Sequence, residues 1–284
     1  EAYLHCVRED YQRARCAAPP KEFGALAHAR TSWRDIRNRG ELLVIPRMGG
    51  VAEVVAACFR GLGVRAECLP EPDAEALRLG RRQTSGKECL PMCLTLGSLL
   101  QRVSQPRDPD EHLALLMPCA TGPCRFGVYG LLHQIVVERL GLKDRVRIWS
   151  PDEADYFAGL SPGFSLLLFG GVMAFDLLQE ALLDTRPVEQ RPGVAADIHT
   201  RYQAQLICLL EQAVRGDLSV RAPLGAVAGG HLFGLRELVA GAATELAAVR
   251  ADRPMPTVLL VGEIYVRLDP FANGFLIREL EARG

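Results

Sequence analysis

Lysine is nearly absent from this 284-residue chain, because only Lys21, Lys87 and Lys143 occur among its 33 basic residues. The other basic residues are arginines scattered along the sequence, and the formal net charge is −1. Proteins that bind nucleic acids usually carry a clustered excess of positive charge. The composition therefore argues against a nucleic-acid partner, and we expect the arginines on solvated faces.

Long apolar runs are also lacking. The most apolar segment, FSLLLFGGVMAF at 164–175, is too short to span a bilayer and runs directly into Asp176. The start of the chain, EAYLHCVREDYQRAR, lacks the apolar core of a signal peptide. We therefore expect a cytoplasmic protein without a membrane segment, in which the cysteines are reduced thiols or metal ligands rather than disulfides.

Strand-like and helix-like segments alternate over the first half of the chain. Short apolar runs at 41–46, 64–70, 113–118 and 145–151 are typical of buried strands, and segments with helical periodicity separate them. Strand–helix–strand units of this kind pair in parallel with right-handed crossovers. The sequence predicts an α/β fold with an open parallel sheet of the flavodoxin or Rossmann type.

The pattern divides the chain into four segments. We predict an amino-terminal helical extension at 1–40, an α/β domain with the cysteine motifs at 41–190, and a helical connecting segment at 191–252. The run TVLLVGEIYV at 257–266 restarts the strand pattern, so 253–284 are expected to begin a second α/β domain. Because the chain begins at Glu and stops soon after this restart, we expect a fragment of a longer polypeptide.

Four of the nine cysteines occupy two short segments rich in glycine and proline, KECLPMC and CATGPCRFG. Cys89 and Cys93 are four residues apart at the start of a predicted helix, so both thiols can face the same side. Cys119 and Cys124 follow a predicted strand, at the edge where open parallel sheets bind their ligands. The positions of these four cysteines predict a site at the rim of the sheet.

Thiolates in such segments suit a metal centre, because amides at a helix start favour negative charge and glycines let backbone approach a bulky group. Soft sulfur ligands favour an iron–sulfur cluster or zinc, although three and four intervening residues differ from the two-residue spacing common in zinc knuckles. We predict that Cys58 and Cys208 pack as small hydrophobes and that His133 is a structural histidine.

A different chemistry also fits the second segment. Cys119 and Arg125 form a Cys-x5-Arg pattern between a strand and a helix, the arrangement in which a thiolate attacks a phosphate held by loop amides and arginine. Pro123 removes one amide that this cradle needs, and Cys124 could form a disulfide with the nucleophile. A thiol phosphatase is one alternative function.

The motifs GKEC and GPCRFG, together with IPRMGG, DYFAGLSPG, ALLDTRPVE and VGEIYVRLDPFAN, resemble the 2-hydroxyacyl-CoA dehydratase and benzoyl-CoA reductase superfamily, particularly its activase-related proteins. The resemblance extends from about residue 41 to the carboxyl terminus. It implies flavodoxin-like domains and a 4Fe–4S cluster, or a linked double cluster, held by cysteines at a domain interface. It also implies an ATP-dependent activator protein that donates low-potential electrons for reduction or dehydration.

Carried over residue by residue, the resemblance assigns Cys89 and Cys124 most directly as cluster ligands, with Cys93 and Cys119 completing a set of four. Two cysteines per chain would instead mean one cluster shared across a homodimer. Arg125 would offset the negative charge of the cluster.

The resemblance also places Glu263, Tyr265 and Arg267 at the cofactor, across an interdomain cleft. In the alternative, these polar residues and Asn273 cap helices and tie the domains together. No Walker-type glycine loop occurs, so the chain is expected to receive electrons from an ATP-hydrolysing partner. A non-catalytic docking component with a structural cluster or zinc is a further alternative, and no pattern names a substrate or decides whether the chain is an enzyme.

Overall fold

The structure is a computed structural model that describes residues 31–152, 156, 158–216, 218 and 221–283. The chain divides into two units, Glu1–Thr31 and Ser32–Gly284, and only the second is described below. Most of the predicted amino-terminal extension lies outside the described residues. Its last part is helix α2 (Trp33–Asn38), which starts with a capping box between Ser32 and Asp35.

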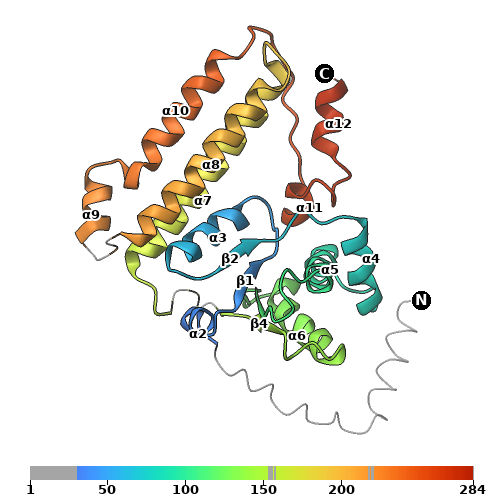
Figure 1. The fold of residues 1–284 in the computed structure, drawn as a ribbon. Coiled ribbons are helices and arrows are strands. Elements are labelled where there is room, and N and C mark those ends of the chain that lie inside the picture. Colours follow the sequence, from blue (N-terminus) through green and yellow to red (C-terminus); the bar gives the residue numbers. More distant parts are fainter. Residues whose placement is uncertain (1–30, 153–155, 157, 217, 219–220, 284) are drawn as a thin grey trace. The chain divides into compact units, whose positions relative to one another are not determined.

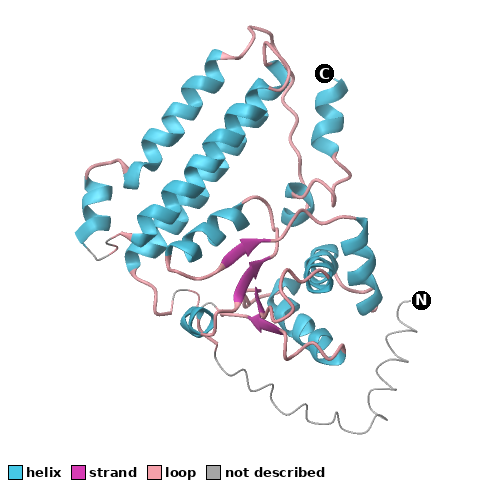
Figure 2. Ribbon diagram, viewed as in Figure 1, coloured by secondary structure: helices cyan, strands magenta, loops and turns pink. Residues whose placement is uncertain are grey.

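The described residues contain one four-stranded parallel sheet with the strand order β2-β1-β3-β4 (Figure 2). Each strand lies inside a run that the sequence predicts as a strand, and the α/β open-sheet fold is therefore confirmed. An order with β1 between β2 and β3 is that of the flavodoxin-like doubly wound sheet. The strands are β1 (Leu42–Ile45), β2 (Ala66–Cys68), β3 (Leu113–Leu116) and β4 (Val146–Trp149).

The central strands β1 and β3 are buried along their whole length. Alternate residues of β1 enter different cores, because successive side chains of a strand point to opposite faces. Leu42 and Val44 pack on the side of α5 and α6, whereas Leu43 and Ile45 pack on the side of α3. Burial on both faces explains why these strands read as continuous apolar runs rather than as an alternating pattern.

Helices cover both faces of the sheet (Figure 1). One face is covered by α3, which follows β1, and the other by α5 and α6, with α4 packed against α5. The connection from β1 to β2 therefore runs over one face of the sheet, and the connections to β3 and β4 run over the other. The point at which the strand order changes direction lies between β1 and β3. The helices are α3 (Val51–Gly61), α4 (Ala74–Gln83), α5 (Leu90–Ser104) and α6 (Tyr129–Arg139).

A layer of long helices lies outside α3. Figure 1 shows α7, α8 and α10 running side by side, with the short α9 at one end. Their apolar residues form one core with Val54 and Cys58 of α3, and this core includes Phe164 and Leu206. The helices of this layer are α7 (Pro162–Thr185), α8 (Val194–Arg215), α9 (Arg221–Ala228) and α10 (Leu235–Ala248). The last three lie within the segment predicted as helical, whereas α7 lies within residues 41–190, which the sequence assigned to the α/β domain.

Helix α7 is longer than the apolar run that predicts it. Together with the 3-10 turn that follows it, α7 forms a helical stretch of 27 residues, Pro162–Val188. Among the described residues, it is the one helix that is long and apolar enough to cross a membrane by length and composition alone. Its inner face packs in the core of the helical layer through Phe164, Leu167 and Leu178, and 33% of its most apolar window is buried. Its outer face exposes Met173 to 65%.

The carboxyl-terminal segment corrects one prediction. Residues 257–262 form no strand in the structure, and Glu263 instead caps the short helix α11 (Ile264–Leu268), which α12 (Leu276–Arg283) follows. Leu259 and Val261 of this segment are 81% and 74% exposed. A strand needs a neighbour for its N–H and C=O groups, and no described residue pairs with this run. The prediction of a strand here is wrong for that reason.

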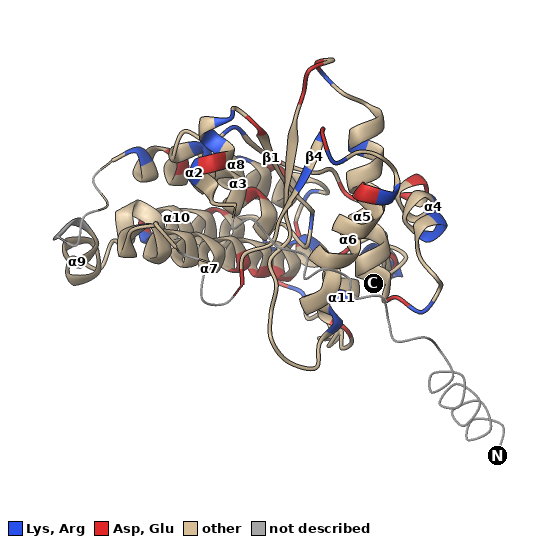
Figure 3. Ribbon diagram, turned by 90° about the horizontal axis from the view of Figure 1, so that it is seen from below, with Lys and Arg blue, Asp and Glu red and all other residues tan. Residues whose placement is uncertain are grey.

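Charged residues of both signs are interspersed over the elements, while α7 and α10 carry few of them (Figure 3). One group of charges is buried. Arg102, at the end of α5, pairs with Glu67 of β2 and with Glu111 before β3, at 2.8 Å in each case. The guanidinium group also holds the pKa of Glu111 below its usual range. These pairs connect α5 to two strands of the sheet.

Two glycines allow α4 and α5 to cross with their backbones in contact. A Cβ atom at Gly80 would overlap the carbonyl group of Cys93, and one at Gly97 would overlap that of Ala76. Neither obstacle is the flexible end of a side chain, so the helices would have to separate to admit a methyl group. The crossing therefore determines where the turn between α4 and α5 lies.

We predict that Gly97→Ala lowers the free energy of unfolding by about 2 kcal/mol, because forcing a methyl group into close packing shifts backbone. Chemical denaturation of the two proteins measures this change. Gly225→Ala is the matched control, since a Cβ atom at Gly225 in α9 meets nothing within 4 Å. Equal destabilisation by both variants would contradict the close crossing.

His133 lies in α6 with none of its surface exposed. Its Nε2 atom lies 3.5 Å from the carbonyl oxygen of Met92 and 3.4 Å from the hydroxyl of Thr95. Because a carbonyl only accepts, Nε2 carries the proton and donates to α5, while Nδ1 has no partner. Burial lowers the pKa of His133 to about 4 from an ordinary value of 6.5. The prediction of a structural histidine agrees with this environment.

The depressed pKa of His133 predicts a pH-dependent stability. Between about pH 6.5 and pH 4 the unfolded chain binds a proton that the folded chain does not, so acidification favours unfolding by up to ~1.4 kcal/mol per pH unit. Denaturation of His133→Gln across this range should show a shallower loss of stability than the parent. The exposed His112→Gln serves as the control, and parallel curves for all three proteins would contradict the assignment.

Candidate functional site

Cys89 and Tyr129 form the centre of the site that the sequence predicts. Cys89 is the residue immediately before α5, and its side chain makes no capping bond to that helix. Its Sγ atom instead lies 2.7 Å from the hydroxyl oxygen of Tyr129, the first residue of α6. Tyr129 is only 3% exposed. A buried phenol therefore connects the starts of the two helices that cover this face of the sheet.

Cys124 lies at the same place in the fold. It precedes the 3-10 turn Arg125–Val128, makes no side-chain cap there, and is exposed. Burial raises the pKa of Tyr129, and its hydrogen bond to Cys89 acts in the same direction. Cys89 is thus the predicted ligand that contacts this hydroxyl group, while Cys124 and Glu263 are near enough to act on it electrostatically.

Arg125 holds the two cysteine loops together. Its Nη1 atom donates a hydrogen bond of 2.6 Å to the carbonyl oxygen of Lys87, 38 residues away. Lys87 is two residues before Cys89, and Arg125 directly follows Cys124. The residue predicted to offset cluster charge therefore first serves to position the loops.

Cys93 and Cys119 have different surroundings. Cys93 is 6% exposed in the crossing of α4 and α5, with its Sγ atom 3.6 Å from the hydroxyl of Thr84. Cys119 donates its S–H to the carbonyl oxygen of Gly127 at 3.0 Å. Within the described ranges, no group of three or more His, Cys, Asp or Glu side chains is arranged to hold a metal ion.

The donor set therefore fits part of a cluster site. Cys89 and Cys124 lie in loops that the Arg125–Lys87 hydrogen bond joins, and each precedes a helical turn. Cys93 and Cys119 make other contacts, to Thr84 and to the carbonyl group of Gly127. This arrangement fits a site to which this chain brings two sulfur ligands.

The arrangement does not provide the cradle of a thiol phosphatase. A nucleophilic thiolate in such a loop accepts hydrogen bonds, whereas Cys119 donates its proton to a carbonyl group. Arg125 bonds to Lys87 rather than to the loop that follows Cys119. The geometry gives no support to that alternative.

The predicted residues of the carboxyl-terminal segment separate into two environments. Glu263 caps α11 by accepting the N–H of Val266 at 2.8 Å, and its charge also acts on Tyr129. Tyr265 is buried, and Arg267 lines a cavity on the other side. Asn273 accepts from the N–H of Leu276 and donates to the carbonyl of Arg267. The capping interpretation therefore describes Glu263 and Asn273, although Glu263 also belongs to the surroundings of Tyr129.

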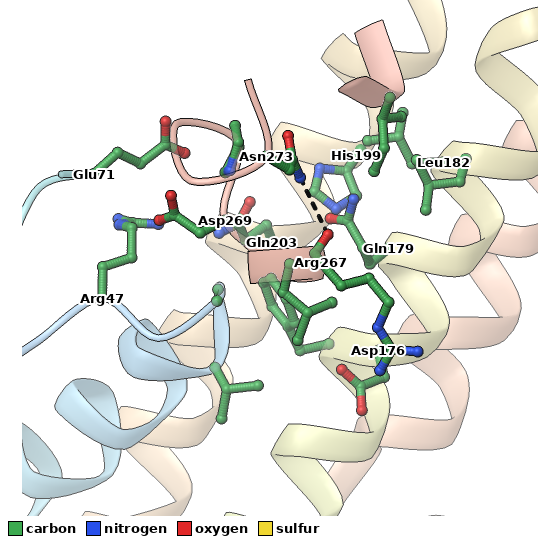
Figure 4. A pocket seen from close by; sticks show the side chains of 18 of the residues that line it. Arg47, Glu71, Asp176, Gln179, Leu182, His199, Gln203, Arg267, Asp269 and Asn273 are labelled. Carbon is green, nitrogen blue, oxygen red and sulfur yellow. Dashed lines mark hydrogen bonds between the residues drawn. The ribbon is translucent and has the colours of Figure 1, made fainter. Parts of the chain in front are cut away.

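The cavity beside Arg267 has a volume of about 470 Å³ and opens beside the loop that follows β1 (Figure 4). Arg267 is the one predicted site residue among those that line it. The pair Gly49–Gly50 in the loop after the buried strand β1 is a sequence signal that could have indicated a ligand site, because open parallel sheets bind ligands at that edge. The polar lining residues come from the loops after β1 and β2, from α7 and α8, and from α11 onward, and no motif unites them.

Two further cysteines test the packing predictions. Cys58 is fully buried in the helical layer, where burial raises its pKa to about 12, and its role as a small hydrophobe is confirmed. Cys208 is exposed on α8 and accepts a hydrogen bond from Gln212. The prediction for Cys208 is wrong because the apolar stripe of α8 runs through Leu206 and Leu210, each two residues from Cys208 and therefore on the opposite side of the helix.

Comparison with known proteins assigns no relative to this chain. No family model, no curated protein and no solved structure matches it. Function must therefore be argued from the two sites themselves.

Proposed function

We propose that this chain is an iron–sulfur protein in which Cys89 and Cys124 bind a 4Fe–4S cluster. The observation that carries the proposal is that the loop of Cys124 and the loop of Cys89 are joined by the hydrogen bond from Arg125 to Lys87, beside the contact of Cys89 with Tyr129. Two cysteines supply half of the four sulfur ligands that such a cluster usually has. A cluster shared by two copies of the chain would have a complete set.

The surroundings of the two thiols support this role. The loops before Cys89 and Cys124 contain Gly86 and Gly122 at positive φ, and a Cβ atom at either position meets nothing within 4 Å. Backbone without side chains on the open side of each loop leaves room for a bulky inorganic group. Cys124 is exposed, which allows a second copy to approach it.

When bound, a cluster of this kind accepts and donates single electrons at low potential. Tyr129 would donate a hydrogen bond to the Cys89 sulfur, and Arg125 would hold the two ligand loops at a constant separation. On the resemblance to the dehydratase and reductase superfamily, the donor would be an ATP-hydrolysing activator protein in the cytoplasm. The cluster would then be sensitive to oxygen.

Anaerobic reconstitution tests this proposal. We expect about two irons and two acid-labile sulfides per chain, broad visible absorption, and a dimer whose formation depends on the cluster. Cys89→Ala and Cys124→Ala should each abolish iron binding and dimerisation. The variants Cys93→Ala, Cys119→Ala and the exposed control Cys208→Ala should retain both, with circular dichroism as the check on folding.

Three outcomes would reject the proposal. They are no iron or sulfide after reconstitution, stoichiometric zinc in place of iron, and full iron content in Cys89→Ala or Cys124→Ala. About four irons per chain, lost on removal of Cys93 or Cys119, would replace the shared cluster by one held within a single chain.

Tyr129→Phe tests the role of the phenol. The hydroxyl bonded to Cys89 stabilises the more negative, reduced form of the cluster, so its removal should make the reduction potential more negative. The shift should correspond to on the order of 1 kcal/mol, the scale of one hydrogen bond. Potentiometric titration of the parent and the variant measures it. An unchanged potential with full iron content would contradict the contact.

A further inference from the structure

A second site lies beside α11, in the cavity of about 470 Å³ at the carboxyl end of β1 (Figure 4). The loop after β1 forms one wall, α7 and α8 form another, and the residues that follow Tyr265 close the third. None of the four clustered cysteines lines it. Cavities of this size accommodate small organic ligands.

Three residues that line this cavity each have a buried side-chain polar atom without a partner. The atoms are Asp269 Oδ2, His199 Nε2 and Arg267 Nε, half of the six such side-chain atoms among the described residues. Asp269 is 1% exposed and His199 is 8% exposed. Buried polar groups are nearly always hydrogen-bonded, and those that are not require an explanation. Three in one place point to a ligand that supplies the missing bonds.

The charges at the cavity have both signs. Arg47 pairs with Glu53 at 2.6 Å, and Arg186 pairs with Glu281 at 2.9 Å, so these two arginines are neutralised. The side chain of Arg267 forms no ion pair with a described residue. On the acidic side, Glu71, Asp176 and Asp269 also line the cavity and form no ion pair in the described part of the chain. A ligand that carries charge of one sign only would pair either with Arg267 or with the acidic residues, but not with both.

Among the residues that line the cavity, Asp269 has the strongest need for a partner from a ligand. Its Oδ1 atom accepts the N–H of Ala272 at 2.7 Å, while Oδ2 has no partner. Burial, followed by the charge of Glu71, raises the pKa of Asp269, and this outweighs the backbone hydrogen bonds and the charge of Arg47, which act to lower it. A buried carboxylate without a partner is costly, and a bound cation would remove that cost.

We propose that this cavity binds an amino-acid zwitterion, with its carboxylate at Arg267 and its ammonium group at Asp269. His199 then supplies a further hydrogen bond through Nε2. The first turn of α3 is next to the cavity and has no side-chain cap, since its N-cap is Gly50. Its free N–H groups add positive potential on the side of the carboxylate.

The apolar wall of the cavity indicates the side chain that the ligand carries. Phe175, Leu182 and Leu183 of α7 and Leu268 of α11 line it. The ring of Phe175 lies against Gly50, where a Cβ atom would overlap it. An aliphatic or aromatic side chain would bury its surface against these residues. We therefore expect apolar amino acids to bind more tightly than polar ones.

Calorimetric titration of the full chain with each of the twenty L-amino acids tests the proposal. At least one apolar amino acid should bind. Its N-acetyl derivative, which lacks the ammonium group, and its amide, which lacks the carboxylate, should each bind about tenfold or more weakly, because each loses a charge-assisted hydrogen bond. No binding of any of the twenty at millimolar concentration overturns the proposal. Equal binding of either derivative also overturns it.

Two variants test the assigned contacts. Asp269→Asn keeps the oxygen that caps Ala272, and Arg267→Gln keeps a polar donor, so both should fold, with thermal unfolding as the check. Each should weaken binding about tenfold or more, whereas the exposed Arg82→Gln on α4 should not. Unchanged affinity in both site variants would reject the contacts.

The two sites can be tested separately. The amino acid should bind Cys89→Ala, which lacks a cluster ligand, with the affinity of the parent. Loss of iron would therefore leave this site intact, and absence of amino-acid binding would leave the iron–sulfur proposal untouched.

Discussion

The backbone contact between α4 and α5 is the constraint on which the cysteine site depends. Gly80 and Gly97 let the two helices approach until carbonyl groups fill the space of a side chain. This approach fixes the turn that carries Lys87 and Cys89 and also buries Cys93 within the crossing. The same helix crossing therefore places Cys89 in the loop at the rim of the sheet and buries Cys93 between the helices.

Helix α11 stands between the two sites. Glu263 at its start contributes charge to the surroundings of Tyr129, while Arg267 near its end and Asp269 after it face the cavity. α11 also contacts α5, the helix that Cys89 begins. A single turn of helix therefore borders both the thiol pair and the cavity, and its position is set by packing on elements from the first half of the chain.

The sequence predicted the sheet well because β1 and β3 are buried on both faces, so their residues are continuously apolar whatever surrounds them. The strand prediction failed at residues 257–261, TVLLV, because these β-branched and apolar residues favour a strand but have no neighbouring strand among the described residues to pair with. That the loops of Cys89 and Cys124 lie side by side, joined by Arg125 and Lys87, could be predicted, since ligand loops gather at one edge of a parallel sheet. The proximity of His199 and Asp269 could not be predicted, because they are 70 positions apart on elements that share no pattern, and only folding makes them neighbours.

The ion pairs of Arg102 have a consequence for how this protein can change over generations. Replacing Arg102 alone leaves Glu111 in the interior without this counter-charge, whereas replacing Glu111 alone leaves Arg102 its ion pair with Glu67. Coordinated exchange of both for apolar residues of similar volume would avoid that penalty. Descendants are thus expected to keep Arg102 wherever they keep Glu111, so an intact glutamate at position 111 opposite an aliphatic residue should be rare.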